Sequence, residues 1–495
     1  MLSNKWFILL LVILMYLPVS IDATILHIAI PTLSFVFSAN ANQILWVMDI
    51  YPLVIAGLLL PMGALGDRIG YRKLAITGLL AFAAASLLAG LSISIYMLII
   101  GRALLGIGAA MILPATLAGI RHLFSDAKER STAIALWSAV GIGGAAAGPL
   151  LGGYLLEHYY WGSVFLINLP MALCIAILLF YFAPEQSSKT TQKLEIKKSL
   201  LFVVLLILLV YSAKALLRAK QLDVGSLLTG SISTLVMIGF VRNELKSPNP
   251  MIDFSLFKNR VIMTGVLMAF FSMVSIVGFE LAIIQELQFV YDLTPLRAGL
   301  FILPLILASG AGGFLASWLN ARTSIRFIGI SGVFLSACCF FALASINIMH
   351  NIPLTVTLLI IQGATLNTAL FASTAAIMSS VNAEKAASAG AIESMAYELG
   401  AGFGIVIFGI LLSLGFAHSI LLPDGLTAIQ IQQASHSINE TLLLATEIQA
   451  PSLQDQLTAA AKTAFLESHK MVLTVAGCIL LLVSAIVYKF LPRRI

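Results

Sequence analysis

The stretch Gly63-Ala-Leu-Gly-Asp-Arg-Ile-Gly-Tyr-Arg-Lys73 joins two long apolar runs and contains three basic residues, one acidic residue and three glycines. Glycine permits a tight turn where two backbones approach closely. Arginine and lysine hold such a loop on the cytoplasmic side of a membrane. The stretch therefore predicts a tight cytoplasmic turn between two membrane-spanning helices.

An eroded copy of this stretch, Gly313-Phe-Leu-Ala-Ser-Trp-Leu-Asn-Ala-Arg322, occurs 250 residues later. In the copy, serine replaces Asp67 and tryptophan replaces Arg68, while a glycine, a leucine and the second arginine keep their places. An internal copy predicts two related halves, which is a common arrangement in secondary transporters. Only the first half is expected to retain the charged version of the loop.

The composition excludes a water-soluble enzyme, because 60% of the 495 residues are hydrophobic and only 10% are charged. Runs of about 20 apolar residues recur along the chain, each long enough to cross a ~30 Å hydrocarbon core. The net charge of +6 comes from basic residues in short loops, which indicates membrane topology rather than nucleic-acid binding. The four cysteines lie within apolar runs, so neither a disulfide framework nor a metal site is indicated. No phosphate-binding loop or other enzyme motif is present, and we expect no cofactor.

The predicted fold is an all-α integral membrane protein with fourteen transmembrane helices, arranged as two six-helix bundles plus two inserted helices. The spans are expected at about 6–30, 43–65, 73–94, 96–120, 131–156, 162–183, 199–217, 224–242, 261–284, 296–319, 325–347, 353–380, 387–416 and 470–490. Placing the amino terminus inside puts most Lys and Arg on the cytoplasmic side, so both termini are expected to be cytoplasmic.

Three parts follow from the positions of the polar segments. Residues 1–183 are expected to form the N-terminal six-helix bundle, and 184–260 to hold cytoplasmic linkers and the two inserted helices. Residues 261–495 are expected to form the C-terminal six-helix bundle. Within it, 417–469 is a long extracytoplasmic loop whose polar-apolar pattern predicts short amphipathic helices.

Charged residues inside the predicted spans mark candidate sites, because a charge in the bilayer is costly. Asp22 is expected ~24 Å from the inner edge of the first span, and Arg102 ~21 Å from the inner edge of the fourth. The depths match, so the two can form an ion pair. That pair either orients two helices statically or exchanges a proton for a cation, because a proton and a cation compete for one carboxylate. We prefer the second interpretation.

Span thirteen carries Glu393, Tyr397 and Glu398. Glu398 is expected ~16 Å deep and Glu393 ~9 Å deep, with 393 and 397 on one helix face and 398 about 100° further round. Glu398 is the stronger candidate for a cation or proton site, since Glu393 could pair with a loop lysine. Glu280 and Glu286, at the outer end of span nine, are either site residues or solvated vestibule residues. The Tyr397 ring suits a lipophilic cation, although packing alone also explains an aromatic residue.

The fifth span contains Gly144, Gly148 and Gly152 at helical spacing, with Pro149 among them. The glycines form one smooth face for close helix packing, and proline introduces a bend or weak point. The alternative is ordinary small-residue packing, but the order of the residues favours a conformational role.

These residues resemble the major facilitator superfamily, and within it the fourteen-span drug:proton antiporters. Residues 63–73 resemble the loop signature of the superfamily, and 144–153 resemble the fifth-span signature of antiporters. Residues 22–31 are similar to the first-span signature of the fourteen-span group. Residues 102–106 resemble the fourth-span motif, with Leu105 where glutamine is usual. The resemblance covers nearly the whole chain.

The resemblance is strongest to exporters of methyl viologen and quaternary ammonium antiseptics. It implies proton-coupled antiport of lipophilic cationic drugs, dyes and antiseptics, biguanides included, by alternating access in the bacterial inner membrane. The proton gradient would supply the energy, and the partners would be protons, small lipophilic cations and membrane lipid, with no nucleic acid and a monomeric chain. Some similar exporters carry an acidic residue in span ten; here 296–319 has none, so recognition of divalent cations is expected to be altered.

The resemblance also implies a cytoplasmic gate built on the opening stretch. Asp67 would cap the positive end of span thirteen near 382–388 in the outward-open state. The two arginines of the stretch would pair with Asp126 or Glu129 in the next cytoplasmic loop. The residues assigned to this gate are Gly63, Asp67, Arg68, Gly70, Arg72, Asp126 and Glu129.

Two other functions stay open on the sequence. One is proton-coupled transport of an endogenous metabolite, although the antiporter-like fifth span argues against import. The other is a non-transporting membrane sensor or scaffold. Buried charge at Asp22, Arg102 and Glu398 argues against a scaffold, which gains nothing from it.

Overall fold

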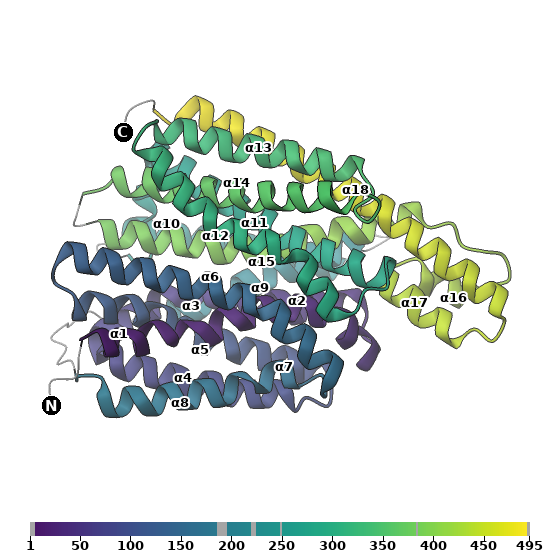
Figure 1. The fold of residues 1–495 in the computed structure, drawn as a ribbon, viewed down its shortest axis with the longest axis horizontal. Coiled ribbons are helices and arrows are strands. Elements are labelled where there is room, and N and C mark those ends of the chain that lie inside the picture. The colour runs from purple at the N-terminus through teal and green to yellow at the C-terminus, as the bar shows by residue number, and fades with distance from the viewer. Residues whose placement is uncertain (1–4, 186–195, 219–223, 248–249, 383–384, 493–495) are drawn as a thin grey trace. The chain divides into compact units, whose positions relative to one another are not determined.

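The computed structural model describes residues 5–185, 196–218, 224–247, 250–382 and 385–492. Within these ranges the chain is built from helices, and none of it forms a β-strand (Figure 1). Fourteen helical segments are long and apolar enough to cross a membrane. The predicted all-α, fourteen-span architecture is therefore confirmed.

The first half begins with a span made of two consecutive helices and ends with the two inserted helices. In order these are α1 (Lys5–Leu14) with α2 (Tyr16–Val36), α3 (Ala41–Ile69), α4 (Tyr71–Gly90), α5 (Ile95–Leu123), α6 (Ala127–His158), α7 (Ser163–Leu166) with α8 (Asn168–Phe182), α9 (Ile196–Arg218) and α10 (Val224–Lys246).

The second half begins after a 3-10 turn and contains six further spans and two short helices. In order these are η1 (Phe254–Lys258), α11 (Arg260–Gln285) continuing into the π-helical turn η2 (Glu286–Val290), α12 (Pro295–Asn320), α13 (Ile325–Ser345), α14 (Ile352–Ser379), α15 (Ala386–Ser419), α16 (Ala428–Ala434), α17 (Ile438–Glu447) and α18 (Pro451–Phe490).

The chain divides into two compact units that do not follow a single cut in the sequence. Unit 1 comprises Met1–Leu26, Ile50–Leu151 and Gly162–Leu256, and unit 2 comprises His27–Asp49, Gly152–Trp161 and Phe257–Ile495. Two short segments of the first half thus belong with the C-terminal helices. The three-part division by sequence position stays a prediction.

The opening stretch forms a turn of one residue. Helix α3 runs to Ile69 and α4 begins at Tyr71, so Gly70 alone joins them, with φ 89° and ψ 147°. A side chain is strained in this backbone conformation, which is why glycine stands there. The predicted tight turn is confirmed, although most of the stretch is helical rather than loop.

The eroded copy lies at the equivalent place, because α12 ends at Asn320, which aligns with Gly70. The basic residue of the copy makes a different contact from those of the first stretch. The Arg322 guanidinium lies 3.7 Å from the centre of the exposed Trp318 ring. The second half therefore replaces the charges of Asp67 and Arg68 with a cation–π contact.

The segment 417–469 contains the predicted short helices, α16 and α17, but its residues from Pro451 onward already belong to α18 (Figure 1). The two short helices and the start of α18 share a small apolar core of Ala434, Leu444, Ala445 and Leu457. The 40 residues of α18 span ~60 Å, about twice a ~30 Å hydrocarbon core. Its N-terminal half therefore extends beyond the membrane. The short helices predicted within 417–469 are present, and the segment also holds the start of α18, which was not predicted.

Lys214 lies within the seventh span, in α9, and is 2% exposed. Helix α9 continues to Arg218, so the lysine is one turn before the end of the helix.

Candidate transport sites

The side chains of Asp22 and Arg102 form a buried ion pair in unit 1. Asp22 lies on α2 and Arg102 on α5, with 0% and 2% of the residues exposed. Nη1 of Arg102 donates to Oδ2 of Asp22 at 2.5 Å. The pairing predicted from matched depths is confirmed.

Two further residues complete the surroundings of this pair. Nδ2 of Asn168 donates to the other carboxylate oxygen of Asp22 at 3.3 Å, and the Arg102 guanidinium lies 4.3 Å from the centre of the Tyr51 ring. Helices α5 and α8 therefore contact the carboxylate on α2, and α3 contacts the guanidinium through Tyr51. Both oxygens of Asp22 have donors, as a charge in a low-dielectric interior requires.

Asn168 was missed by the sequence analysis. It begins α8, where the sixth span is interrupted between Leu166 and Asn168. The available signal was an amide inside an otherwise apolar run, two residues before Pro170. A buried amide in a membrane span needs a hydrogen-bond partner, and that requirement points to a polar group on another helix.

The glycines of α6 pack against the opposite face of α2. A Cβ at Gly148 would collide with the Thr24 hydroxyl and lie 2.9 Å from the Ile21 carbonyl oxygen, and one at Gly144 would collide with Ser20. The Thr24 hydroxyl donates to the Ala145 carbonyl at 3.0 Å. Residues 20 and 24 lie about 200° round the helix from residue 22. The predicted smooth face is thus confirmed at two positions, behind the helix that carries Asp22.

The other two residues of the stripe also lie within α6. Gly152 is buried and Pro149 lies inside the helix. Their conformational role stays a prediction.

The carboxylate of Glu393 in unit 2 is held by two hydroxyl groups. Oε1 accepts from Thr374 Oγ1 at 2.5 Å and from Tyr397 Oη at 2.7 Å, and the two hydroxyl oxygens are 3.0 Å apart. Thr374 lies on α14, and the other two lie on α15. The shared face of 393 and 397 is confirmed, and Glu393 binds hydroxyls rather than a loop lysine.

Glu398 and Glu280 differ from Glu393, because neither carboxylate has a hydrogen bond or ion pair with any residue that the structure describes. Glu398 is partly exposed on α15, and Glu280 is 9% exposed on α11. An ionised carboxylate in a membrane protein requires a counter-charge or water. The predicted role of these two carboxylates in binding a proton or a cation stays a prediction. Glu286, in contrast, is buried and pairs with His469, so the solvated alternative was wrong for it.

The arginines of the opening stretch do not pair with the next loop as expected. Arg72 lies 3.3 Å from a carboxylate oxygen of Glu185 and donates to the Phe180 carbonyl oxygen. Arg68 and Asp67 are exposed at the end of α3. The cap that Asp67 was expected to form on span thirteen stays a prediction.

The two acidic residues of that loop have other partners. Asp126 caps the start of α6, where its Oδ1 accepts from the backbone N–H of Lys128 and of Glu129 at 3.0 and 2.9 Å. Glu129 forms an ion pair with Lys5 at 2.7 Å. The expected pairing with Arg68 or Arg72 was therefore wrong for the conformation seen here. Asp126 directly precedes α6 and occupies its N-cap position. The sequence analysis did not recognise this carboxylate as a helix cap.

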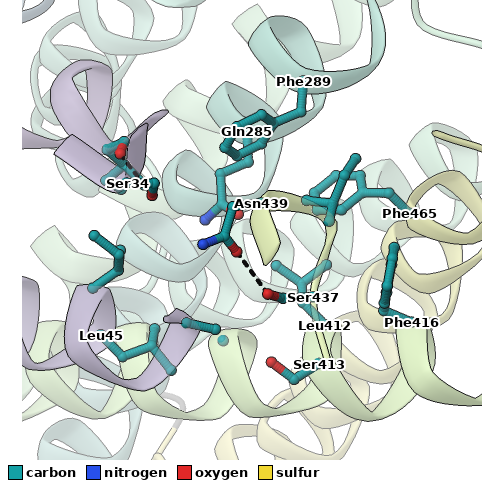
Figure 2. Close-up of a pocket in the computed structure, with 15 residues that line it drawn as sticks. Ser34, Leu45, Gln285, Phe289, Leu412, Ser413, Phe416, Ser437, Asn439 and Phe465 are labelled. Carbon is teal, nitrogen blue, oxygen red and sulfur yellow. Dashed lines mark hydrogen bonds between the residues drawn. The ribbon is translucent and has the colours of Figure 1, made fainter. Parts of the chain in front are cut away.

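A small cavity with a mostly apolar lining lies in unit 2, where the first residues of α17 contribute to it (Figure 2). Its volume is about 40 Å³, and Ser34, Gln285, Ser413 and Asn439 contribute to its lining. The Ser437 hydroxyl donates to Asn439 Oδ1 at 2.7 Å, drawn as a dashed line in Figure 2. None of the predicted site carboxylates lines it, so we assign it no transport role.

The sequence profile of the Major Facilitator Superfamily matches residues 12–422. The chain belongs to this superfamily. It is 48% identical over 485 residues to the methyl viologen resistance protein SmvA of Salmonella typhimurium, covering 97% of each chain. It is 33% identical to the multidrug efflux pump LfrA of Mycolicibacterium smegmatis, covering 98% of this chain and 96% of that one.

Among solved structures, the fold is similar to a bacterial homolog of the human lysosomal transporter Spinster in an inward-facing, occupied conformation. The TM-score is 0.70 at 15% identity, and the match covers 98% of this chain and 97% of that chain. This likeness confirms the major facilitator fold. Together with the bacterial relatives, it makes the chain a multi-pass transporter of the bacterial inner membrane and a member of the drug-efflux group.

Proposed function

We propose that the chain exports lipophilic cationic drugs, dyes and antiseptics in exchange for protons. The observation that carries the proposal is the buried contact between Asp22 and Arg102, because it places one titratable carboxylate beside one fixed cation. The names of the relatives, a methyl viologen resistance protein and a multidrug efflux pump, support the substrate class. Methyl viologen-like and quaternary ammonium compounds, and biguanides, fit that class.

The coupling step follows from competition for the Asp22 carboxylate. When Asp22 is ionised, the guanidinium of Arg102 and the amide of Asn168 hold it. When Asp22 takes a proton, the attraction to Arg102 is lost, while the Tyr51 ring still offers the guanidinium a cation–π contact. Proton uptake therefore loosens α2 from α5, and proton release draws them together.

Cation recognition is assigned to unit 2. The carboxylates of Glu398 and Glu280 have no internal partner among the described residues, so a cationic substrate or a proton can neutralise them. Glu393 is engaged by Thr374 and Tyr397, and we assign it the role of orienting the Tyr397 ring. A ring held in one orientation can stack on a flat aromatic cation.

The glycines of α6 provide the sliding surface for this motion. Gly144 and Gly148 let α6 approach α2 at backbone distance, so α2 can shift without side chains interlocking. The basic loops favour cytoplasmic termini. We propose that the chain works as a monomer in contact with lipid, uses the proton gradient as its energy source and needs no bound cofactor.

The proposal is tested by reconstituting the purified chain into liposomes preloaded with ethidium. An imposed proton gradient, acidic on the side opposite the dye, should drive dye export, and a proton ionophore should abolish it. Asp22→Asn should lose gradient-driven export, while Asp455→Asn, an exposed acid on α18, should retain it. Export that is insensitive to the ionophore in the parent protein would refute proton coupling.

A further inference from the structure

Glu286 and His469 form a buried pair in unit 2 that the transport mechanism above does not use. Glu286 is the first residue of η2, at the end of α11, and His469 lies in α18; they are 4% and 3% exposed. Nδ1 of His469 contacts Oε2 of Glu286. An ionised carboxylate only accepts hydrogen bonds, so Nδ1 carries the hydrogen. The neutral ring then has its lone pair at Nε2.

That second nitrogen is buried and has no hydrogen-bond partner among the residues that the structure describes. His469 also lines a cavity of about 130 Å³, together with the polar residues Glu286, Tyr291, Asn347 and Lys470 and several leucine and isoleucine side chains. The volume and the polar part of the lining suit several water molecules. A ring with a free basic nitrogen at the edge of such a cavity is a candidate proton acceptor.

The other polar groups around the pair do not compete for this proton. The Tyr291 hydroxyl donates to Asn347 Oδ1 at 3.0 Å. Burial, and next the neighbouring Glu286 carboxylate, raise the pKa of Tyr291 well above its usual range, so the phenol stays protonated. Lys470 is already compensated by Glu467 at 2.8 Å on the exposed side of α18.

The remaining neighbours are aromatic or already paired. The rings of Phe279, on α11, and Phe465, on α18, each have their centre 6.4 Å from that of the imidazole. Asp292, in the turn after η2, pairs with Lys462 on α18 at 2.5 Å. The pair of Glu286 and His469 is thus the group in this region that is left to change its charge.

We propose that His469 and Glu286 form a second proton-binding site, loaded from the extracytoplasmic side. A hydronium ion in the cavity transfers its proton to Nε2 and becomes water, and the resulting imidazolium forms an ion pair with Glu286. His469 lies 21 residues before Phe490, the last residue of α18, which places it ~32 Å from the terminal side of the membrane. The direction of proton loading rests on the proposed function and on the cytoplasmic location of the termini. Proton binding by His469 does not depend on either.

The first experiment counts protons bound by the purified full-length chain in detergent, without drug, between pH 8 and pH 5. His469→Asn keeps an amide group near the Nδ1 position, facing Glu286, but lacks Nε2. It should bind about one proton fewer than the parent protein. His436→Asn, at an exposed position just before α17, is the matched control for replacing a histidine by asparagine. An unchanged count in His469→Asn would mean that His469 does not titrate, and would overturn the proposal. If that variant does not fold, His469→Gln gives the same test.

The second experiment measures the side of loading in liposomes, with dye exchange followed while external and internal pH are varied separately. His469→Asn and Glu286→Gln should need about tenfold more external protons for half-maximal exchange, with the internal pH dependence unchanged. The same external profile as the parent protein would overturn loading from outside. If the parent protein shows no dye–proton exchange, the proposed function fails, and the proton count alone decides whether the second site exists.

Discussion

Asp22 and Asn168 lie 146 residues apart in the chain and meet at a 3.3 Å hydrogen bond inside unit 1. The bond engages the carboxylate oxygen that Arg102 leaves free, since the guanidinium contacts Oδ2 and the amide contacts Oδ1. Asn168 therefore fixes the orientation of the carboxylate that we assign to proton exchange.

Replacing Asn168 should weaken proton-coupled transport without abolishing it. Asn168→Leu removes a hydrogen bond to a charged group, which is worth about 1.5–3 kcal/mol. We expect a lower rate of gradient-driven ethidium export in liposomes and a changed pH profile. Cys174→Ser, at an exposed position of the same helix, should behave as the parent protein. A pH profile identical to that of the parent would show that Asn168 only packs.

Helix α6 should tolerate a methyl group at Gly143, which lies off the glycine face, but not at Gly148, which lies on it. At Gly148 an added Cβ meets Thr24 and the Ile21 backbone, whereas at Gly143 nothing lies within 4 Å. Gly148→Ala should lower thermal stability, by about 1–3 kcal/mol of overpacking, and should slow transport. Gly143→Ala should do neither. Equal transport rates for the two variants would contradict the close contact between α6 and α2.

Glu398 should distinguish charged from neutral substrates. Glu398→Gln removes the negative charge and keeps the size of a side chain that has no partner among the described residues. A lost contact of about 1.4 kcal/mol corresponds to tenfold weaker binding, so cationic dyes should bind about tenfold more weakly and neutral ones unchanged. Fluorescence binding titrations on the purified protein measure this. An equal loss for both classes would remove Glu398 from direct cation contact.

Gly70 should be sensitive to any side chain because of its backbone conformation. With φ 89° and ψ 147° it occupies a region open essentially to glycine alone. Gly70→Ala should destabilise the turn by about 1–3 kcal/mol, which a thermal unfolding assay in detergent detects. Gly63→Ala is the matched control, since its Cβ would meet only Pro114 at an ordinary 3.8 Å. Equal midpoints for the two variants would show that the turn relaxes freely.

The sequence predicted the helices well because hydrophobic length and short basic loops are local signals. It also predicted the pairing of Asp22 with Arg102, because depth in a membrane can be counted along each helix. The partners of Arg72 and Glu129 could not be derived in this way. Loop charges have several oppositely charged neighbours at similar distances, and the rotation of each helix about its axis decides between them.

The pairing of Glu286 with His469 shows a different limit. The sequence placed Glu286 at the outer end of a span and His469 in a loop. In the structure α18 begins nineteen residues earlier than expected, at Pro451, and so carries the histidine to the glutamate. Because 451–469 is polar, it was not predicted to be part of the last span. Hydropathy indicates whether a segment faces lipid or water, but it does not show where a helix begins or ends.

The central claim is that uptake and release of a proton by Asp22 are linked to substrate binding and to the rearrangement of the helices. Drug-induced proton release from the purified protein tests this claim most directly. Ethidium added to weakly buffered, detergent-solubilised protein should release protons, and methyl viologen should show whether a dication does the same. Asp22→Asn should reduce the release, while Asp455→Asn should match the parent protein. Undiminished release from a folded Asp22→Asn variant would contradict the account and move the coupling carboxylate elsewhere.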